Sequence, residues 1–217
     1  MDSIPPRRRG RPAKTAPAAA DTRAALVRAG MELLTESGFV ATGIDQVLRR
    51  VGVPKGSFYQ NFASKDDFGL AVVDAYGAYF AAKLQRWLGN PAHPPLARLA
   101  DFIADAKAAM VRFQFRRGCL VGNLAQEMGG RHQDFRQRLE AVMADWQARV
   151  AACLDEAAAQ GQIAADTDCR RWAEFFWIGW EGAILRAKLT GSLAPLDLFA
   201  DSFLALLEGG KPCSKPS

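Results

Sequence analysis

Apolar residues recur at helical spacing along most of this chain. Between residues 42 and 51 they occupy positions 44, 47, 48 and 51. The spacing i, i+3, i+4, i+7 predicts an amphipathic helix that carries Gln46, Arg49 and Arg50 on its outer face. Similar patterns predict helices over residues 21–37, 54–61, 65–88, 96–113, 131–160, 172–188 and 196–207. No segment sustains the two-residue alternation of a strand, so we expect an all-α fold.

The predicted helices at 42–51 and 54–61 are joined by a tight turn at Gly52. Glycine readily adopts the left-handed backbone that ends a helix and reverses the chain. We expect the Thr42 hydroxyl to cap the first helix, and Pro54 to open the second, where its missing N–H costs no hydrogen bond. This arrangement predicts a helix-turn-helix. An αα-hairpin inside a helical bundle is the alternative.

The second helix of this pair carries cations, hydroxyls and amides around the apolar anchors Val53 and Phe58. Cations and hydroxyls suit phosphates, amides suit base edges, and a glycine lets a backbone come close to DNA. The helix therefore has the composition of a DNA recognition helix. The candidate phosphate contacts are Lys55, Ser57, Tyr59 and Lys65, the candidate base contacts are Gln46, Gln60 and Asn61, and Thr42 and Gly56 complete the set.

Most of the net charge of +5 lies in the first fourteen residues, where five Arg and Lys residues stand against one Asp. Residues 1–20 have almost no apolar anchors, so we expect a disordered basic arm that meets an anionic partner. Within it, Arg9 and Arg11 flank a glycine and precede a proline, a segment that resembles the core of an AT-hook. Such a segment enters a narrow minor groove. A nonspecific tail that only neutralises phosphates is the alternative.

The run from Val51 to Phe68, VGVPKGSFYQNFASKDDF, resembles the DNA-binding signature of the tetracycline-repressor (TetR) family. In that family the signature follows one helix near the N-terminus, as it does here. The resemblance implies a homodimer whose three-helix DNA-binding heads, residues 21–67, enter successive major grooves of a pseudo-palindromic operator. It also implies a helical ligand-binding and dimerisation domain over residues 68–210, a tail at 211–217, and a small-molecule inducer that shifts the spacing of the heads.

Two later stretches are candidates for a ligand site. Residues 116–128 mix cations, a thiol, an amide and a carboxylate with apolar residues, and buried polar groups of this kind either pair internally or meet a ligand. The helix at 172–188 is apolar nearly all round, which is typical of a pocket wall or of a four-helix dimer interface completed by residues 196–207. Burial within one subunit is the alternative. The candidate ligand contacts are Arg117, Cys119, Asn123, Glu127, Trp177, Trp180 and Lys188.

These two stretches, RRGCLVGNLAQEMG and FWIGWEGAILRAKL, resemble the body of the acrylate-responsive repressors within the TetR family. The resemblance implies acrylate or a related small acid or electrophile as the inducer. Electrophile-sensing relatives carry a reactive cysteine beside a lysine of a later helix, which by position would be Cys119 and Lys188. A cation, Arg117 or Lys188, could lower the pKa of the Cys119 thiol, or it could pair with the carboxylate of a reversibly bound acid. Cys119 as a small buried residue is the remaining alternative.

Other classes of protein are less well supported. The four cysteines form no C-x-x-C pair and the histidines are His93 and His132 alone, so we expect neither a metal site nor a cofactor. No apolar run reaches the ~20 residues of a membrane span, and the polar N-terminus lacks a signal-peptide pattern, so we expect a cytoplasmic location without membrane contact. The rival is a helical thiol enzyme with Cys119 as nucleophile, assisted by Arg117, Glu127 or Lys188. Because an enzyme leaves the basic arm and the helix pair without a role, we expect a regulator.

Overall fold

The computed structural model describes residues 19–130 and 132–209, and the helices of this part of the chain confirm the predicted all-α fold. No strand occurs in these residues. The helices are α1 (Ala19–Ser37), α2 (Ile44–Val51), α3 (Lys55–Tyr59), α4 (Lys65–Leu88), α5 (Pro95–Arg112), α6 (Leu120–Met128), α7 (Gln133–Ala159), α8 (Cys169–Thr190) and α9 (Ala194–Gly209).

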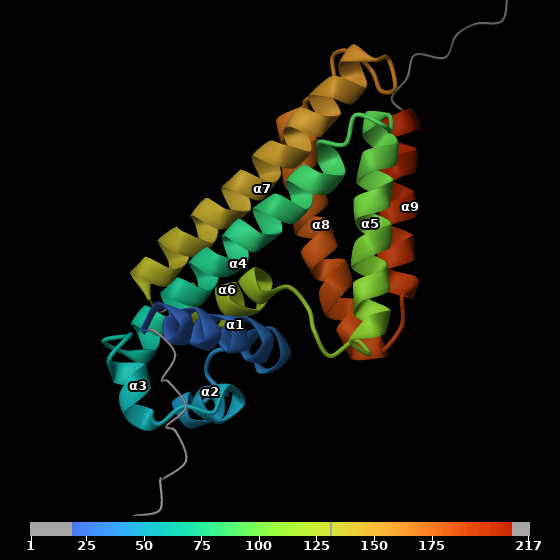
Figure 1. Ribbon diagram of the computed structural model, residues 1–217. Coiled ribbons are helices and arrows are strands. Elements are labelled where there is room, and N and C mark those ends of the chain that lie inside the picture. The colour runs from blue at the N-terminus through green and yellow to red at the C-terminus, as the bar shows by residue number, and fades with distance from the viewer. Residues whose placement is uncertain (1–18, 131, 210–217) are drawn as a thin grey trace, which may run out of the picture.

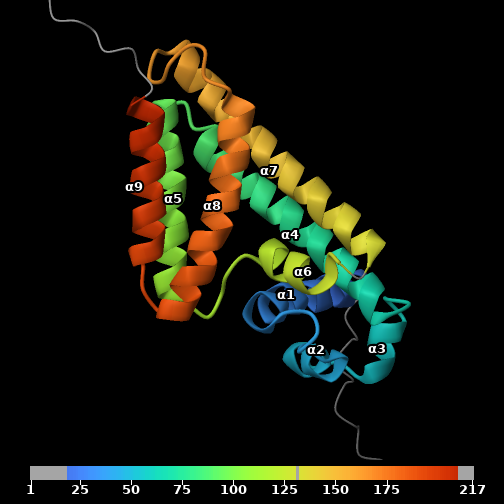
Figure 2. The same ribbon diagram turned by 180° about the vertical axis from the view of Figure 1, so that it is seen from behind.

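The helices form a small cluster at one end of a larger helical body. Figure 1 shows α1, α2 and α3 gathered at one end, while the long helices α4 and α7 lie side by side and lead away from them. In the view from behind, α5, α8 and α9 form a second layer beside this pair, and α6 lies between α1 and the body (Figure 2). No described helix has both the length and the apolar character that crossing a membrane requires.

Local signals set the ends of the first helices as predicted. Gly38 and Gly52 adopt positive φ angles of 80° and 74°, and the N–H of Gly52 donates to the Leu48 carbonyl at 2.8 Å. The Ser64 hydroxyl accepts a hydrogen bond from the Asp67 N–H at 3.0 Å and so caps α4. These contacts satisfy backbone groups that a helix end otherwise leaves without partners.

The predicted cap at Thr42 is wrong. Gly43 is the N-cap of α2, and the Thr42 side chain is buried and donates its hydroxyl hydrogen to the Gly38 carbonyl at 2.7 Å. A threonine hydroxyl readily bonds a carbonyl four residues earlier, and here that bond closes the α1–α2 turn. Helix α1 begins at Ala19, two residues before the predicted start, and the basic arm with Arg9 and Arg11 lies outside the described residues.

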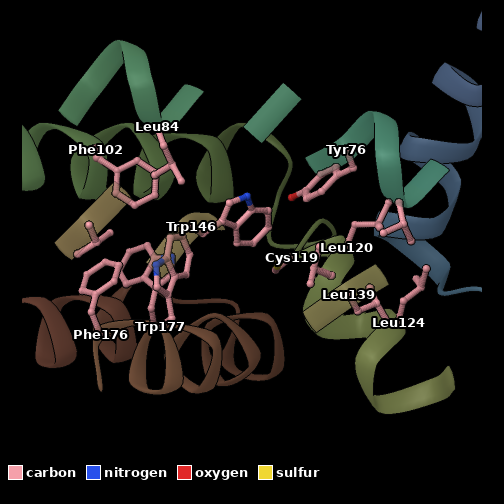
Figure 3. Packing of buried hydrophobic residues seen from close by; sticks show 14 of the residues in the cluster. Tyr76, Leu84, Phe102, Cys119, Leu120, Leu124, Leu139, Trp146, Phe176 and Trp177 are labelled. Atoms are coloured by element: carbon pink, nitrogen blue, oxygen red, sulfur yellow. The ribbon is translucent and has the colours of Figure 1, made fainter. Parts of the chain in front are cut away.

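Aromatic side chains from four helices fill the centre of the body. The rings of Trp146 on α7 and Trp177 on α8 lie 5.1 Å apart, and Phe80 on α4 is 4.3 Å from Trp146. Figure 3 shows Trp146 and Trp177 together with Phe102 and Phe176 on one side of Tyr76 and Cys119. Burial of each large side chain contributes roughly 1.5–3 kcal/mol, so the cluster holds the body together and makes a firm wall for any cavity beside it.

Candidate DNA-binding face and ligand cavity

Helix α3 presents polar side chains at the free end of the molecule. Phe58 is fully buried and packs its ring 5.4 Å from both Phe62 and Phe68, which fixes α3 against the start of α4. Because this one residue anchors the short helix, the opposite face is free. Lys55, Gly56, Tyr59 and Gln60 are exposed on that face.

The remaining candidate DNA contacts are less exposed. Gln46 and Ser57 are half-buried, and Asn61 donates through Nδ2 to the Ser57 carbonyl at 2.7 Å. The Lys65 Nζ lies 4.6 Å from the centre of the Phe39 ring and donates to the Val40 carbonyl at 3.5 Å. Asn61 and Lys65 therefore support the local fold as well as bordering the exposed face. Thr42 is buried and presents no group to DNA.

A cavity of about 340 Å³ lies where α1 meets the body. Its walls come from α1, α4, α5, α8 and the segment that leads into α6. Trp177, Trp180 and Phe80 supply apolar surface, whereas Arg28 and Arg112, both exposed, stand where the cavity meets solvent. A concave, mostly apolar space with a few polar groups is typical of a small-molecule site. The polar lining residues are Arg28, Glu32, Thr35, Tyr76, Tyr79, Lys83, Arg112, Arg117, Cys119 and Glu181.

The structure brings four of the seven candidate ligand contacts to this cavity, namely Arg117, Cys119, Trp177 and Trp180. Asn123 and Glu127 face the other way, because Asn123 donates through Nδ2 to the Thr35 carbonyl at 3.1 Å and Glu127 accepts from two N–H groups of the α1–α2 turn. Lys188 lies beside Gly118 but outside the cavity lining. Asn123, Glu127 and Lys188 therefore do not line this cavity, and their role as ligand contacts stays a prediction.

Glu127 is the firmest polar link between α6 and the first helices. Its Oε2 accepts from the N–H groups of Phe39 and Val40, each at 2.8 Å. Gly38 makes room for this contact, because a Cβ there would lie 1.8 Å from the Glu127 carboxylate. A carboxylate that accepts two backbone N–H groups makes strong, directional bonds. Helix α6 therefore ties the wall of the cavity to the turn in front of α2.

Arg117 already has partners for its charge. Its Nε donates to the Glu36 Oε1 at 2.8 Å, its guanidinium lies 4.1 Å from the centre of the Phe113 ring, and Glu32 is 3.8 Å away. Arg117 thus joins the segment before α6 to α1. A ligand carboxylate would have to compete with Glu36 for it.

The Cys119 thiol is protected against ionisation. Burial raises its pKa well above the ordinary value, and the neighbouring Glu181 carboxylate raises it further. The Cys119 Sγ accepts a weak bond from the Gly122 N–H at 3.5 Å. Of the alternatives open from the sequence, a cation that lowers this pKa is disfavoured, because Arg117 is bonded to Glu36 and the nearby charge is a carboxylate. A thiol in such surroundings is a poor nucleophile.

Glu181 is the functional candidate that our sequence reasoning missed. It lines the cavity, and its Oε1 is buried without a hydrogen-bond partner among the described residues. Burial raises the pKa of this carboxyl group to about 7, while a hydrogen bond from the Cys119 thiol opposes the shift. The signal was present in the sequence, since Glu181 is the single charged residue between Phe175 and Leu185. An isolated acid in an apolar helix is costly and so is often functional.

Two family models match this chain. The model "Bacterial regulatory proteins, tetR family" matches residues 26–72, and "Tetracyclin repressor-like, C-terminal domain" matches residues 95–203. The transcriptional regulator AcuR of Cereibacter sphaeroides is 50% identical over 202 residues, which cover 93% of this chain and 92% of AcuR. The transcriptional repressor DhaR of a Mycobacterium species is 30% identical over 193 residues, 88% of this chain and 96% of DhaR.

Solved structures share the fold. A regulatory protein TetR from Rhodobacter sphaeroides has a TM-score of 0.81 at 50% identity, over 84% of this chain and 97% of that one. The reduced form of Escherichia coli NemR has a TM-score of 0.75 at 25% identity, over 86% of this chain and 97% of that one. Both similarities extend over most of the two chains compared.

Proposed function

This chain belongs to the TetR family of transcriptional regulators, and we propose that it is a dimeric repressor that leaves its operator when a small organic acid binds. Repression itself follows from the relatives AcuR and DhaR. Both are regulators of transcription, and the similarity to this chain covers nearly the whole length of each. The protein is therefore a regulator and not a thiol enzyme. The operator, the dimer and the inducer are the parts that we propose, together with a cytoplasmic location.

Operator binding is supported by the exposed face of α3. Lys55 and Tyr59 can donate to phosphates, Gln60 can reach base edges, and a Cβ at Gly56 would have no neighbour within 4 Å, so the backbone there is open to DNA. Phosphate contacts fix the position of such a helix, and contacts to base edges select the sequence. We assign Ser57, Gln46, Asn61 and Lys65 to the border of the same interface.

A homodimer is supported by the apolar outer face of α8 and α9. Ile178 and Leu189 on α8 and Leu198 on α9 are 65%, 69% and 71% exposed, and Phe175 and Leu206 are also exposed. An apolar face of this kind on two adjacent helices is typical of an interface, and a two-fold pair would form a four-helix bundle. Complete burial of α8 inside one subunit is excluded by these exposures. The dimer would place two α3 helices on successive major grooves.

The observation that carries the induction proposal is the cavity at the junction of α1 and the body. Exposed cations at its edge, Arg28 and Arg112, favour the approach of an anion, and the apolar wall suits a short hydrocarbon chain. We propose acrylate or a related small acid as the inducer. The wall segment continues into α6, so a change in the cavity would reach the α1–α2 turn through Glu127.

Reversible binding is favoured over covalent capture at Cys119. The raised pKa of this thiol leaves little thiolate at neutral pH, and thiolate is the nucleophile that adds to an activated double bond. Capture of an electrophile by Cys119 is the second candidate, supported by the position of Cys119 in the cavity wall. The two routes differ in whether a saturated acid can act as inducer.

The experiment is release of operator DNA by acrylate and by its saturated analogue propionate. We expect both acids to release DNA from the wild-type protein and from Cys119→Ser, with a modest loss of affinity in the variant. Cys153→Ser, which replaces another buried thiol, is the matched control. If only acrylate acts and Cys119→Ser abolishes its effect, induction is covalent. If neither acid nor a wider panel of small acids releases DNA, the proposed inducer class is wrong.

A further inference from the structure

We propose that Glu181 binds the inducer directly, as a neutral carboxyl group that shares its proton with the carboxylate of a small organic acid. This inference rests on the proposed function, because it takes the cavity to be the inducer site. It assigns the acid-binding group inside the cavity to a carboxyl side chain, whereas an arginine or lysine is the usual partner of a carboxylate.

Glu181 stands at the centre of the α8 face that lines the cavity. Trp177, Trp180, Glu181 and Ile184 follow one another at helical spacing on this face, and all four line the cavity. The Glu181 Oε1 is buried and has no partner among the described residues. A buried polar oxygen without a partner costs about 1–3 kcal/mol, which a ligand that bonds to it would recover. The Trp177 Nε1 on the same face is likewise buried without a partner in the described residues, so the carboxyl group and this indole N–H are the unsatisfied polar groups of an otherwise apolar helix face.

The surrounding backbone makes room for this carboxyl group. A Cβ at Gly122, in the first turn of α6, would lie 2.1 Å from the Glu181 Oε2, so a larger residue there would displace the acid. The Cys119 thiol, at the N-cap of α6, opposes the rise in the pKa of the same carboxyl group. Glu181 therefore touches both the cavity and the start of α6, and a ligand that moves it would also move α6.

The cations deeper in the cavity wall are already neutralised. The Lys83 Nζ lies 2.6 Å from Asp105 Oδ2, and Arg117 is bonded to Glu36. A carboxylate that enters the apolar interior still needs a strong donor, because an anion without one is very unfavourable there. A protonated Glu181 is such a donor, and a hydrogen bond between a carboxyl group and a carboxylate is short and strong.

The proton balance of the binding step is simple. The ligand enters as an anion, Glu181 carries one proton, and the two oxygens share it without any covalent bond being made or broken. The pKa of Glu181 is raised by burial to about 7, so below that pH the proton is already present. Above it, one proton must be taken from solvent for each ligand bound, and affinity then falls about tenfold for each pH unit.

Tyr76 and Cys119, which also line the cavity, do not supply this proton. Burial raises the pKa of both Tyr76 and Cys119 well above their ordinary values, and the Glu181 carboxylate raises both further. Both side chains therefore stay neutral between pH 6 and pH 8.5. The remaining ionisable groups that line the cavity are Tyr79 and Lys83 on α4, Arg112 on α5, Arg117 before α6, and Arg28 and Glu32 on α1.

The test is calorimetric binding of propionate to the full-length protein without DNA, at several pH values from 6 to 8.5. Propionate is the probe because it cannot alkylate a thiol. For the wild type we expect affinity to be nearly constant below pH 7 and to fall about tenfold per unit above it. Titrations in two buffers with different enthalpies of ionisation should show uptake of about one proton per ligand at pH 8.5.

Three variants complete the test. Glu181→Gln keeps a neutral donor, so we expect it to bind propionate with an affinity that does not change with pH. Glu181→Ala should bind weakly at every pH. Glu140→Gln, which alters an exposed acid on α7, should keep the wild-type pH profile.

Two results would overturn the inference, and they differ from failure of the proposed function. If the wild type binds propionate with no proton uptake at pH 8.5, or if Glu181→Gln keeps the wild-type pH dependence, Glu181 does not share a proton with the ligand although the cavity is the inducer site. If the wild type binds neither propionate nor acrylate at any pH, the proposed acid inducer fails, and this inference fails with it.

Discussion

Single residues set the energetics of the cavity, and Glu181 is the most unusual of them. Its carboxyl group is enclosed by an apolar helix face, and the Cys119 thiol is the hydrogen-bond partner that opposes the effect of burial. The pKa is raised from 4.5 to about 7, which means that the folded protein binds the proton more tightly than the unfolded chain does. Protonation therefore stabilises the fold, and this stabilisation is lost as pH rises from about 4.5 to 7.

Glu181→Gln should for this reason stabilise the protein at alkaline pH. The neutral amide removes the charged form that burial disfavours, so we expect the free energy of unfolding at pH 8 to rise by about 3 kcal/mol. The difference from the wild type should shrink as pH falls toward 4.5. Urea unfolding at a series of pH values measures it. A difference that stays constant with pH would mean that the Glu181 pKa is not raised.

Replacement of Lys55 is the most direct single-residue test of whether α3 contacts DNA. It is exposed at the start of α3, so Lys55→Ala should leave the fold and its thermal stability unchanged. Loss of one phosphate contact should weaken operator binding and reduce the slope of log affinity against log salt by about one. Arg170→Ala removes an exposed cation at the start of α8, remote from α3, and should change neither quantity. Equal effects of the two variants would remove α3 from the interface.

At the level of secondary-structure elements, α6 connects the cavity to the first helices. Its N-cap, Cys119, lines the cavity, and Asn123 and Glu127 bond to the end of α1 and to the turn after it. Because α6 is short, we expect it to move as one rigid element, so that a displacement of its N-terminus also displaces its C-terminus. The same ligand-dependent shift would also act on α4, which carries Tyr76 and Tyr79 in the cavity wall and begins beside α3.

Glu127→Ala should uncouple the cavity from operator release. Loss of two charge-assisted bonds should lower the free energy of unfolding by about 2 kcal/mol. Binding of acid to the cavity should persist, because Glu127 does not line it, whereas the acid should release less operator DNA. Gln126→Ala, an exposed neighbour on α6, is the control. Full release in a folded Glu127→Ala protein would show that α6 is not the route.

Sequence predicted the elements whose signals are local, and missed those that depend on distant partners. Gly52 and Ser64 were placed correctly because a left-handed glycine and a side-chain cap act within one helical turn. The contact of Glu127 with the turn after α1 was not predicted, because its partner, the Phe39 N–H, lies 88 residues earlier in the chain, and no periodic pattern records such a contact. Thr42 failed for a different reason, since its buried hydroxyl donates to the Gly38 carbonyl and Gly43 becomes the N-cap of α2.

The helices that form the cavity could be predicted from the sequence, but the directions of their side chains could not. Trp177 and Trp180 were identified because large aromatic residues in an apolar helix mark either a core or a pocket. The part of the wall contributed by α1 could not be predicted, because it depends on how the first helix packs against the body. Lys188 shows the same limit, since its side chain lies beside the lining residue Gly118 without itself lining the cavity.

In the proposed function the whole molecule acts as two copies of the chain, one for each half-site of the operator. Ile178→Glu should place a charge in the centre of the exposed apolar face of α8, where 65% of the side chain is accessible in one subunit. We expect this variant to be monomeric, folded and at least tenfold weaker on a two-half-site operator, because one head alone makes half of the contacts. Ile178→Leu retains the apolar surface and should remain dimeric. Sedimentation and DNA binding by the two variants measure this, and a dimeric Ile178→Glu protein would move the interface elsewhere.

We propose that this repressor binds one operator sequence and dissociates from it when a small acid binds. The most direct measurement is to sequence the genomic DNA fragments that the purified protein retains, and then to wash the retained complexes with acrylate, propionate and other small metabolites. We expect the retained fragments to share one pseudo-palindromic sequence with two half-sites. Small carboxylic acids should elute these fragments, and neutral compounds of similar size should not. Retention of fragments with no shared two-fold sequence, or of an operator that no acid elutes, would contradict it.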